Sequence, residues 1–318
     1  MLITGANGFV GQALCTKLLQ DGVKVTAAVR NNDRLLAAEV IQVVGNIDSQ
    51  TNWTPALFGA DVVVHLAGRA HAMRDTQANP LAAYRAVNTA GTLNLARQAA
   101  SAGVRRLVFV SSIKVCGEGQ VQPDEGAYTE GQPPAPSDPY AISKWEAEQG
   151  LRMLAELTGL EVVILRPPLV YGPSVGANFL RLMKAVSRGW PLPLGAVTNR
   201  RSLIYLGNLV DAIRVSTRHS AAANKTFLLS DGEDVSTPEL IRRLASTFGV
   251  PTRLLPVSEH LLRLTGTVLN KRLAVDRLLG SLVVDSRAIR RDLNWSSPFA
   301  MKQGLVETVK WYEGKFGH

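Results

Sequence analysis

The stretch Thr4-Gly5-Ala6-Asn7-Gly8-Phe9-Val10-Gly11 directly follows the apolar residues 1–3. This pattern predicts a short buried strand, a tight turn and a helix over about 11–20. Glycines at this spacing let the chain turn, let backbone approach a pyrophosphate, and let the helix pack closely on the sheet. The helix N-terminus adds N–H groups and partial positive charge, which suit a diphosphate. The stretch therefore predicts a dinucleotide site at the first strand of an α/β protein.

The end of the second predicted strand, 23–29, bears on which dinucleotide is bound. The residues that follow are Arg30-Asn31-Asn32-Asp33-Arg34. Enzymes that use NAD usually place an acidic residue at this strand end, whereas an arginine accommodates the 2′-phosphate of NADP. We therefore expect NADP(H), with Arg30 and Arg34 as phosphate contacts. NAD(H) stays open, because both arginines can also be ordinary solvated surface residues.

The composition indicates a soluble enzyme. The 318 residues suffice for one large core and a second lobe, and the chain contains only Cys15 and Cys116. Two cysteines give no disulfide framework or metal cluster, which fits a cytoplasmic protein without a metal site. No apolar run approaches the length of a membrane helix, and the chain begins inside a strand, so neither membrane insertion nor a signal peptide is expected. The net charge of +9 comes from scattered Lys and Arg, which fits an anionic substrate better than nucleic acid.

Strand-like and helix-like segments alternate along the first half of the chain, as in a doubly wound parallel sheet of the Rossmann type. The predicted strands of the chain are 60–66, 106–111, 161–165, 203–206 and 226–229. Helical patterns cover 80–102 and 139–157, with Asp138 as the N-cap of the second and Pro139 at its first position. The fold class is therefore α/β, with a Rossmann domain (1–168 and 203–230) and a smaller, discontinuous α/β substrate domain (169–202 and 231–318).

The chemistry is carried by Tyr140-Ala141-Ile142-Ser143-Lys144 and by Ser112, which lies at the end of a predicted parallel strand. Tyr140 and Lys144 are four residues apart on one helix and share a face. An ammonium and a nicotinamide cation nearby would lower the pKa of the phenol and make Tyr140 a general acid-base catalyst. Ser112 can hydrogen-bond a substrate carbonyl or alcohol, because ligands gather at the carboxyl ends of such strands.

These motifs resemble the extended branch of the short-chain dehydrogenase/reductase superfamily, the NAD-dependent epimerases and dehydratases that act on nucleotide sugars. Further similar segments are His65-Leu66-Ala67-Gly68, Asn88-Thr89-Ala90-Gly91-Thr92, Leu165-Arg166-Pro167 and Val170-Tyr171-Gly172-Pro173. The resemblance implies that Asn88 ties active-site backbone together. It also implies these cofactor contacts: Gly5, Asn7, Gly8, Phe9, Val10, Gly11, Asn46, Ile47, Leu66, Ala67, Gly68, Tyr140, Lys144 and Pro167.

Departures from the family pattern narrow the reaction. Sugar dehydratases carry an Asp-Glu pair just after the catalytic Ser or Thr, and this chain has Ile113 and Lys114 there. Dehydration is therefore not expected, and 4-epimerisation and 4-keto reduction remain. The stretch Ser111-Ser112-Ile113-Lys114-Val115-Cys116-Gly117-Glu118 most resembles enzymes that reduce the C4 carbonyl of a UDP-4-keto-6-deoxy-hexosamine. The resemblance thus implies this reduction, which gives a UDP-N-acetylquinovosamine-type precursor for surface polysaccharide such as lipopolysaccharide O-antigen. The alternative is a UDP-sugar 4-epimerase, which shares the hydride and proton machinery. A non-catalytic NAD(P)-sensing protein is a remote alternative, because such proteins commonly lose the Tyr or Lys.

The resemblance also suggests how the UDP-sugar is held. Ser112, Ile113, Lys114 and Tyr140 would face the sugar. Substrate phosphate and nucleotide contacts are expected from Asn178, Arg201 and Arg277, since guanidinium forks suit phosphate oxygens. Ser202 stands where relatives have an acidic residue, which puts the local hydrogen bonding in question. A homodimer through the helices of 80–102 and 139–157 is a further expectation from the family.

Overall fold

Seven parallel strands form the central sheet of the larger lobe, in the order β3-β2-β1-β4-β5-β6-β9. The computed structural model describes residues 1–31, 38–70, 79–119, 126–269 and 272–317. The strands are β1 (Leu2–Thr4), β2 (Thr26–Val29), β3 (Val40–Val43), β4 (Val62–His65), β5 (Arg106–Val110), β6 (Glu161–Arg166) and β9 (Thr226–Leu228). The order reverses between β1 and β4, and the glycine turn follows β1 at this switch point.

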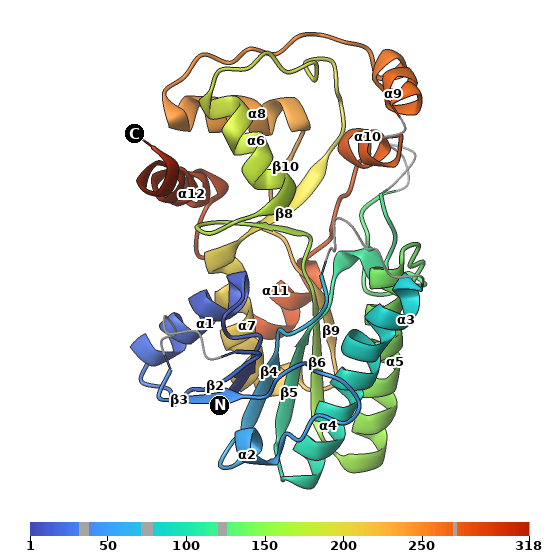
Figure 1. Cartoon of the computed structure of the whole chain (residues 1–318), viewed down its shortest axis with the longest axis vertical. Coiled ribbons are helices and arrows are strands. Elements are labelled where there is room, and N and C mark those ends of the chain that lie inside the picture. Colours follow the sequence, from blue (N-terminus) through green and yellow to red (C-terminus); the bar gives the residue numbers. More distant parts are fainter. Residues whose placement is uncertain (32–37, 71–78, 120–125, 270–271, 318) are drawn as a thin grey trace.

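Helices cover both faces of this sheet (Figure 1). One face carries α1 (Phe9–Gln20), α7 (Leu206–Arg218) and α11 (Arg287–Leu293). The other carries α3 (Pro80–Tyr84), η1 (Arg85–Gly91), α4 (Thr92–Ser101) and α5 (Pro139–Thr158), and the short α2 (Thr54–Leu57) lies near the strand starts. Side chains alternate along each strand: Val108 packs in the core on the α1 side, and its neighbours Leu107 and Phe109 pack on the α4 and α5 side. The doubly wound α/β prediction is confirmed.

A smaller mixed sheet, in the order β10-β8-β7, organises the second lobe. Its strands are β7 (Leu169–Tyr171), β8 (Arg201–Tyr205) and β10 (Asp234–Val235). The helices of this lobe are α6 (Ala177–Ser187), α8 (Thr237–Phe248), α9 (Glu259–Val268), α10 (Arg272–Leu279) and α12 (Met301–Phe316). The strand predicted at 203–206 is β8, which pairs in this small sheet, whereas β9 joins the large one. The chain thus passes repeatedly between the lobes, and the predicted domain boundaries stay a prediction.

The region predicted as one helix over 80–102 is interrupted. A π-helical turn, η1, separates α3 from α4. Inside this turn Asn88 hydrogen-bonds outside its own helix, to the backbone of Arg69 and the side chain of Ser143. Such turns often occur at functional sites. The prediction of helical structure over 80–102 is confirmed, but the π-helical turn inside it was not predicted, because the contacts of Asn88 lie far away in sequence.

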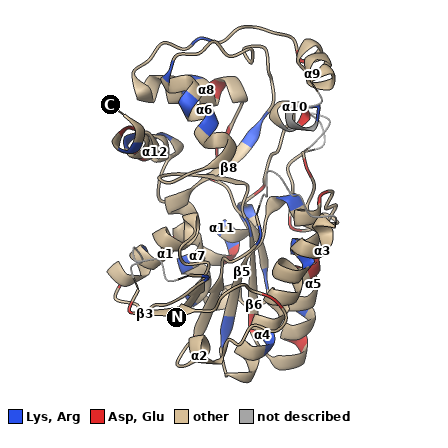
Figure 2. Ribbon diagram, viewed as in Figure 1, with Lys and Arg blue, Asp and Glu red and all other residues tan. Residues whose placement is uncertain are grey.

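The sequence signal for the start of α5 is confirmed. Asp138 caps α5, with Oδ1 accepting from the Ala141 N–H at 2.7 Å, and Pro139 occupies the first turn. Ser236 caps α8 by accepting from the N–H of Glu239. Lys and Arg are distributed over both lobes among acidic residues (Figure 2). Within the described ranges, no helix combines the length and apolar character required to cross a bilayer.

Gly11 provides a test of the turn that starts the fold. A Cβ at this position would lie 2.2 Å from the carbonyl oxygen of Gly5. Gly11→Ala should therefore force α1 away from β1 and lower the free energy of unfolding by roughly 1–3 kcal/mol in urea denaturation. The control is Gly314→Ala in α12, where a Cβ meets no atom within 4 Å; it should be neutral or stabilising by up to ~1 kcal/mol. Equal stability of Gly11→Ala and wild type would contradict this packing.

Candidate active site

The glycine turn shapes a close approach between β1, α1 and the loop after β4. Gly5 has a φ of +65°, and a Cβ there would lie 2.8 Å from the backbone nitrogen of Ala67. The Gly8 N–H donates to the Gly5 carbonyl at 2.9 Å, and Gly8 caps α1 without a side-chain hydrogen bond. The first turn of α1 thus presents backbone N–H groups at the switch point of the sheet, an arrangement that suits a pyrophosphate.

Below this turn, a buried hydrogen-bond chain joins β1, β4 and α4. The Thr4 hydroxyl lies 2.6 Å from His65 Nδ1, and His65 Nε2 lies 2.9 Å from the Thr92 hydroxyl. Thr4 Oγ1 also accepts from the Ala67 N–H at 3.2 Å. Burial, with a smaller contribution from the positive Lys144, lowers the pKa of His65 to about 3. His65 is therefore a neutral structural residue that fixes the loop on which Ala67 and Gly68 lie.

Asn88 ties three backbone segments together, as predicted. Its Oδ1 accepts from the Arg69 N–H at 2.8 Å, while Nδ2 donates to the Arg69 carbonyl at 3.1 Å and to Ser143 Oγ at 3.0 Å. Ser143 lies between Tyr140 and Lys144 on α5. The loop after β4 and the helix that carries Tyr140 are therefore held at a fixed distance by one amide side chain.

The structure brings Ser112, Tyr140 and Lys144 together. Ser112 follows β5 and hydrogen-bonds the Tyr140 phenol. Lys144 is buried; its ammonium donates to the Val110 carbonyl at 3.0 Å and lies 4.5 Å from the centre of the Phe109 ring. These three residues therefore form one cluster at the carboxyl end of β5, where an α/β sheet places its ligands.

Tyr140 differs from expectation in its acidity. Burial raises the pKa of its phenol to about 12, and the hydrogen bond from Ser112 opposes this only in part. The charge of Asp138 and the Coulombic interaction with the Tyr84 phenol, whose ring centroid lies 6.2 Å from that of Tyr140, raise the pKa of Tyr140 further. Within the protein alone the pKa of Tyr140 is not lowered, because desolvation of the phenolate outweighs the favourable contacts. The predicted lowering by Lys144 together with a nicotinamide cation stays a prediction. A lower pKa requires an additional positive charge at the site.

Glu148 is a buried residue beside the candidate active site that sequence reasoning did not single out. It is fully buried one turn beyond Lys144. Its carboxylate accepts from Ser111 Oγ at 2.6 Å and from Arg166 Nη2 and Nε at 2.6 and 3.0 Å. The outer guanidinium of Arg152 completes the set at 2.9 Å. The available signal was a carboxylate at helical spacing behind Tyr140 and Lys144, together with an arginine at a strand end.

Lys114 points towards two carboxylates. Its ammonium lies 2.8 Å from Glu118 Oε1 and 2.6 Å from Asp138 Oδ2. Ile113, the other predicted sugar contact in this turn, is buried, and its N–H donates to the carbonyl of Pro167 at 3.0 Å. The short helix η2 (Ile113–Val115) is thus anchored at both ends, and any contact of either residue with a sugar stays a prediction.

The predicted phosphate contacts occupy the second lobe. Asn178 is exposed in the first turn of α6. Arg201 begins β8; burial lowers the pKa of its guanidinium, which donates to the Gly280 carbonyl at 3.1 Å. The Arg277 side chain lies outside the described residues, although its backbone belongs to α10. Ser202, which stands where relatives have an acidic residue, makes local hydrogen bonds of its own. Its hydroxyl donates to Asp234 and accepts from the Val284 N–H at 2.9 Å.

The other predicted cofactor contacts lie along the carboxyl edge of the sheet. Arg30 is exposed just after β2, and Arg34 lies outside the described residues. Ile47 packs against Gly91, where a Cβ would meet its Cγ2 at 2.6 Å. Of the remaining contacts, Asn46 and Gly68 are exposed, Asn7, Phe9, Val10, Leu66 and Ala67 are half-buried, and Pro167 is buried. The contacts themselves stay predictions.

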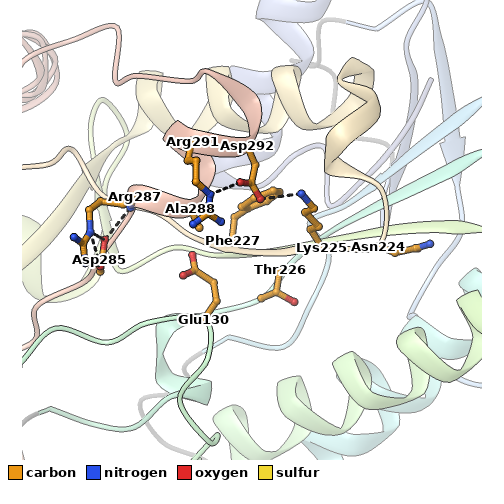
Figure 3. Close-up of a pocket in the computed structure, with 10 residues that line it drawn as sticks. All are labelled: Glu130, Asn224, Lys225, Thr226, Phe227, Asp285, Arg287, Ala288, Arg291 and Asp292. Carbon is orange, nitrogen blue, oxygen red and sulfur yellow. Dashed lines mark hydrogen bonds and ion pairs between the residues drawn. The ribbon is translucent and has the colours of Figure 1, made fainter.

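A separate surface hollow lies beside the edge strand β9 (Figure 3). None of the predicted catalytic residues lines it. Its charges pair with one another: Arg287 with Asp285, and both Arg291 and Lys225 with Asp292. Glu130, on the facing loop, accepts from the Leu228 N–H at 2.9 Å and so covers part of the open strand edge.

The buried Lys144 makes a prediction about stability and pH. Burial lowers the pKa of Lys144 from its ordinary 10.5 to about 8, against the raising effect of Glu148. Between pH 8 and 10.5 the unfolded chain therefore binds more protons than the folded one, so this residue's unfavourable contribution is complete below pH 8 and fades as pH rises. Lys144→Met should stabilise the protein at pH 7, with a gain that shrinks towards pH 10 in urea unfolding. Lys310→Met, at an exposed position, is the control; an equal pH trend in both variants would contradict the prediction.

The Glu148–Arg166 pair predicts a second stability effect. Both side chains are buried, so Glu148→Gln leaves the Arg166 guanidinium without its compensating charge. We expect the free energy of unfolding to fall by about 3–5 kcal/mol. The double variant Glu148→Gln/Arg166→Met removes both charges and should recover a large part of that loss. A double variant that is less stable than Glu148→Gln would contradict this compensation.

Comparisons with known proteins agree with this geometry. The family model described as "NAD dependent epimerase/dehydratase family" matches residues 1–229. A Vibrio cholerae protein named UDP-glucose 4-epimerase is 46% identical over 98% of this chain and 94% of its own length. A protein of Escherichia coli O157:H7 named N-acetyl-alpha-D-glucosaminyl-diphospho-ditrans,octacis-undecaprenol 4-epimerase is 27% identical, over the same shares of the two chains.

Solved structures share the fold across nearly the whole chain. UDP-glucose 4-epimerase of Thermotoga maritima, with UDP-glucose, has a TM-score of 0.78 at 21% identity and covers 99% of this chain and 98% of its own. UDP-glucuronic acid 4-epimerase of Bacillus cereus, with NAD, has a TM-score of 0.79 at 20% identity and covers 99% of each chain. Together with the match to the family model over residues 1–229, these findings identify the chain as a member of the NAD dependent epimerase/dehydratase family.

Proposed function

We propose that this protein is an NAD-dependent UDP-sugar 4-epimerase. The observation that carries the proposal is the 46% identity, over 98% of the chain, to the Vibrio cholerae protein named UDP-glucose 4-epimerase. The cluster of Ser112, Tyr140 and Lys144 supports it. The sequence favoured a 4-keto reductase with the epimerase as its alternative, and the comparisons support the alternative better.

NAD is the proposed cofactor, in place of the NADP that Arg30 suggested. The family is NAD-dependent, and the neighbouring Bacillus cereus structure contains NAD. The glycine turn fits a dinucleotide, because Gly5 and Gly11 let β1, the loop after β4 and the first turn of α1 pack closely, which leaves the N-terminus of α1 at the switch point of the sheet. When bound, NAD would supply a hydride acceptor and donor at the sugar carbon, and its oxidised form would add a positive charge to that of Lys144.

The protein's own residues would manage the proton. Tyr140 accepts the proton of the sugar 4-hydroxyl and returns it after the sugar has presented its other face. Ser112 donates a hydrogen bond to the same oxygen, and Lys144 holds positive charge below the phenol. Because the pKa of Lys144 is about 8, this ammonium loses its charge in mildly alkaline solution. Arg201, on β8 of the second lobe, would hold the substrate diphosphate.

Dimerisation through α4 and α5 stays part of the proposal. Two apolar side chains on α5, Met153 and Leu157, are 64% and 83% exposed. Side chains of this kind favour a helix-to-helix interface with a second copy. We also retain the expectation that the product enters surface polysaccharide synthesis.

Tyr140→Phe is the decisive variant for this function. It should reduce interconversion of UDP-glucose and UDP-galactose, or of their N-acetylated counterparts, by at least ~10²-fold, because the acid-base group is lost. NAD binding, measured by the quenching of tryptophan fluorescence, should persist in this variant. Thr267→Val, at an exposed position on α9, is the matched control. Preserved turnover in Tyr140→Phe would remove the catalytic assignment.

A separate assay distinguishes epimerase from reductase. Purified protein is mixed with NADH or NADPH and UDP-4-keto-6-deoxy-N-acetylglucosamine, and loss of reduced-cofactor absorbance is followed. A parallel sample of the same preparation receives a UDP-sugar with a C4 hydroxyl in place of the keto sugar. Interconversion of the 4-epimers of that UDP-sugar, with no oxidation of NADH or NADPH in the first sample, supports the epimerase. Stoichiometric oxidation without epimer formation would replace it with the 4-keto reductase.

A further inference from the structure

Lys114 joins two parts of the active site that are separate in the sequence. Its backbone N–H donates to Ser112 Oγ at 3.3 Å, and its ammonium reaches Asp138 and Glu118. The side chain is 21% exposed and its two partners are 19% and 22% exposed. The three charges are therefore largely shielded from water, and their interaction is stronger than that of an ordinary surface ion pair.

Asp138 uses its two carboxylate oxygens for different tasks. Oδ1 accepts from the Ala141 N–H at 2.7 Å and caps α5, while Oδ2 receives the Lys114 ammonium at 2.6 Å. Tyr140 is the second residue of α5 and lies in the capped turn. The turn that follows Ser112 is thereby fastened to the turn that carries Tyr140.

We propose that Lys114 is a positioning residue, which holds the turn after Ser112 against the turn that carries Tyr140 and offsets the negative charge of Asp138 and Glu118 beside the phenol. This role deepens the proposed epimerase function and rests on it. It differs from sugar binding, the role that the sequence suggested, because the ammonium is directed to carboxylates of its own chain. It also gives a purpose to a lysine at the position where dehydratases carry an acidic residue.

The charges around Tyr140 predict a measurable consequence. Asp138, just before α5, raises the pKa of the phenol, and Tyr84 of α3 acts in the same direction. Lys144 lies one turn along α5. The Lys114 hydrogen bond holds the pKa of Asp138 below its ordinary value although burial opposes this. Lys114 thus offsets a carboxylate that would otherwise disfavour the Tyr140 phenolate.

Glu118 and Arg69 complete the charged surroundings. Glu118 and Asp138 both contact the Lys114 ammonium, so one ammonium faces two carboxylates. The Arg69 guanidinium carbon lies over the ring of Tyr84, 5.4 Å from the ring centroid. Removing Lys114 therefore leaves two negative charges near the phenol, and removing the charge of Glu118 instead leaves a neutral pair.

The test is a titration of Tyr140 in the NAD-saturated protein. Tyrosines are labelled with ¹³C at the ring carbon that bears oxygen, and the Tyr140 signal is assigned by its loss in Tyr140→Phe. Lys114→Met should raise the pKa of Tyr140 by roughly one unit, the size expected for loss of a nearby opposite charge. Lys114→Arg should keep it near the wild-type value. Lys310→Met, whose ammonium pairs with a glutamate on α12, should leave it unchanged.

Two further variants test the direction in which the pKa of Tyr140 shifts. Glu118→Gln should lower the pKa of Tyr140. This variant tests the inference even if Lys114→Met does not fold. The double variant Lys114→Met/Asp138→Asn should return the pKa close to wild type, because Asn keeps the helix cap while removing the charge.

An unchanged Tyr140 titration in both Lys114→Met and Glu118→Gln overturns the inference, as does a shift of equal sign in the two variants. A wild-type protein that binds NAD but does not interconvert UDP-sugar epimers refutes the proposed function and leaves the titration readable. The same shift of the Tyr140 pKa in Lys310→Met would show that the shift reflects only the protein's net charge, and it would also overturn the inference.

Discussion

The buried ion pair between Glu148 and Arg166 is the interaction on which the candidate active site depends. It joins the middle of α5 to the end of β6, and through Ser111 it also reaches the end of β5. Charges buried at this depth are tolerated only when each is compensated, so the three elements cannot separate without exposing a bare charge to the core. Ser112 follows one end of this network, and Lys144 lies one turn from the other.

Around the Glu148–Arg166 pair, polar contacts between segments distant in sequence hold the reacting groups. Asn88 fixes the loop after β4 to α5, and Lys114 fixes the turn after β5 to the start of the same helix. α5 is therefore held from two sides. Such preorganisation matters for a phenol whose pKa is raised by burial, because small displacements change the charges it experiences.

The second lobe is joined to the first by the hydrogen bonds of one carboxylate. Asp231, just after β9, accepts from the Tyr171 hydroxyl at 2.8 Å, from the Tyr205 N–H at 2.9 Å and from Asn208 at 2.7 Å. These partners belong to β7, β8 and α7, so one carboxylate links the small sheet to a helix that covers the large one. This junction orients β8, and with it Arg201, relative to the sheet that carries Tyr140.

The sequence alone determined the features that depend on local backbone and helical spacing: the glycine turn, the capped start of α5, and Tyr140 and Lys144 on one face. Only the tertiary structure decided which partners those residues meet. Glu148 and Arg166, the π-helical turn at Asn88, and the pairing of β8 with the small sheet all depend on contacts between distant segments, which local patterns do not encode. The raised pKa of Tyr140 has the same origin, since desolvation is set by the whole surrounding fold.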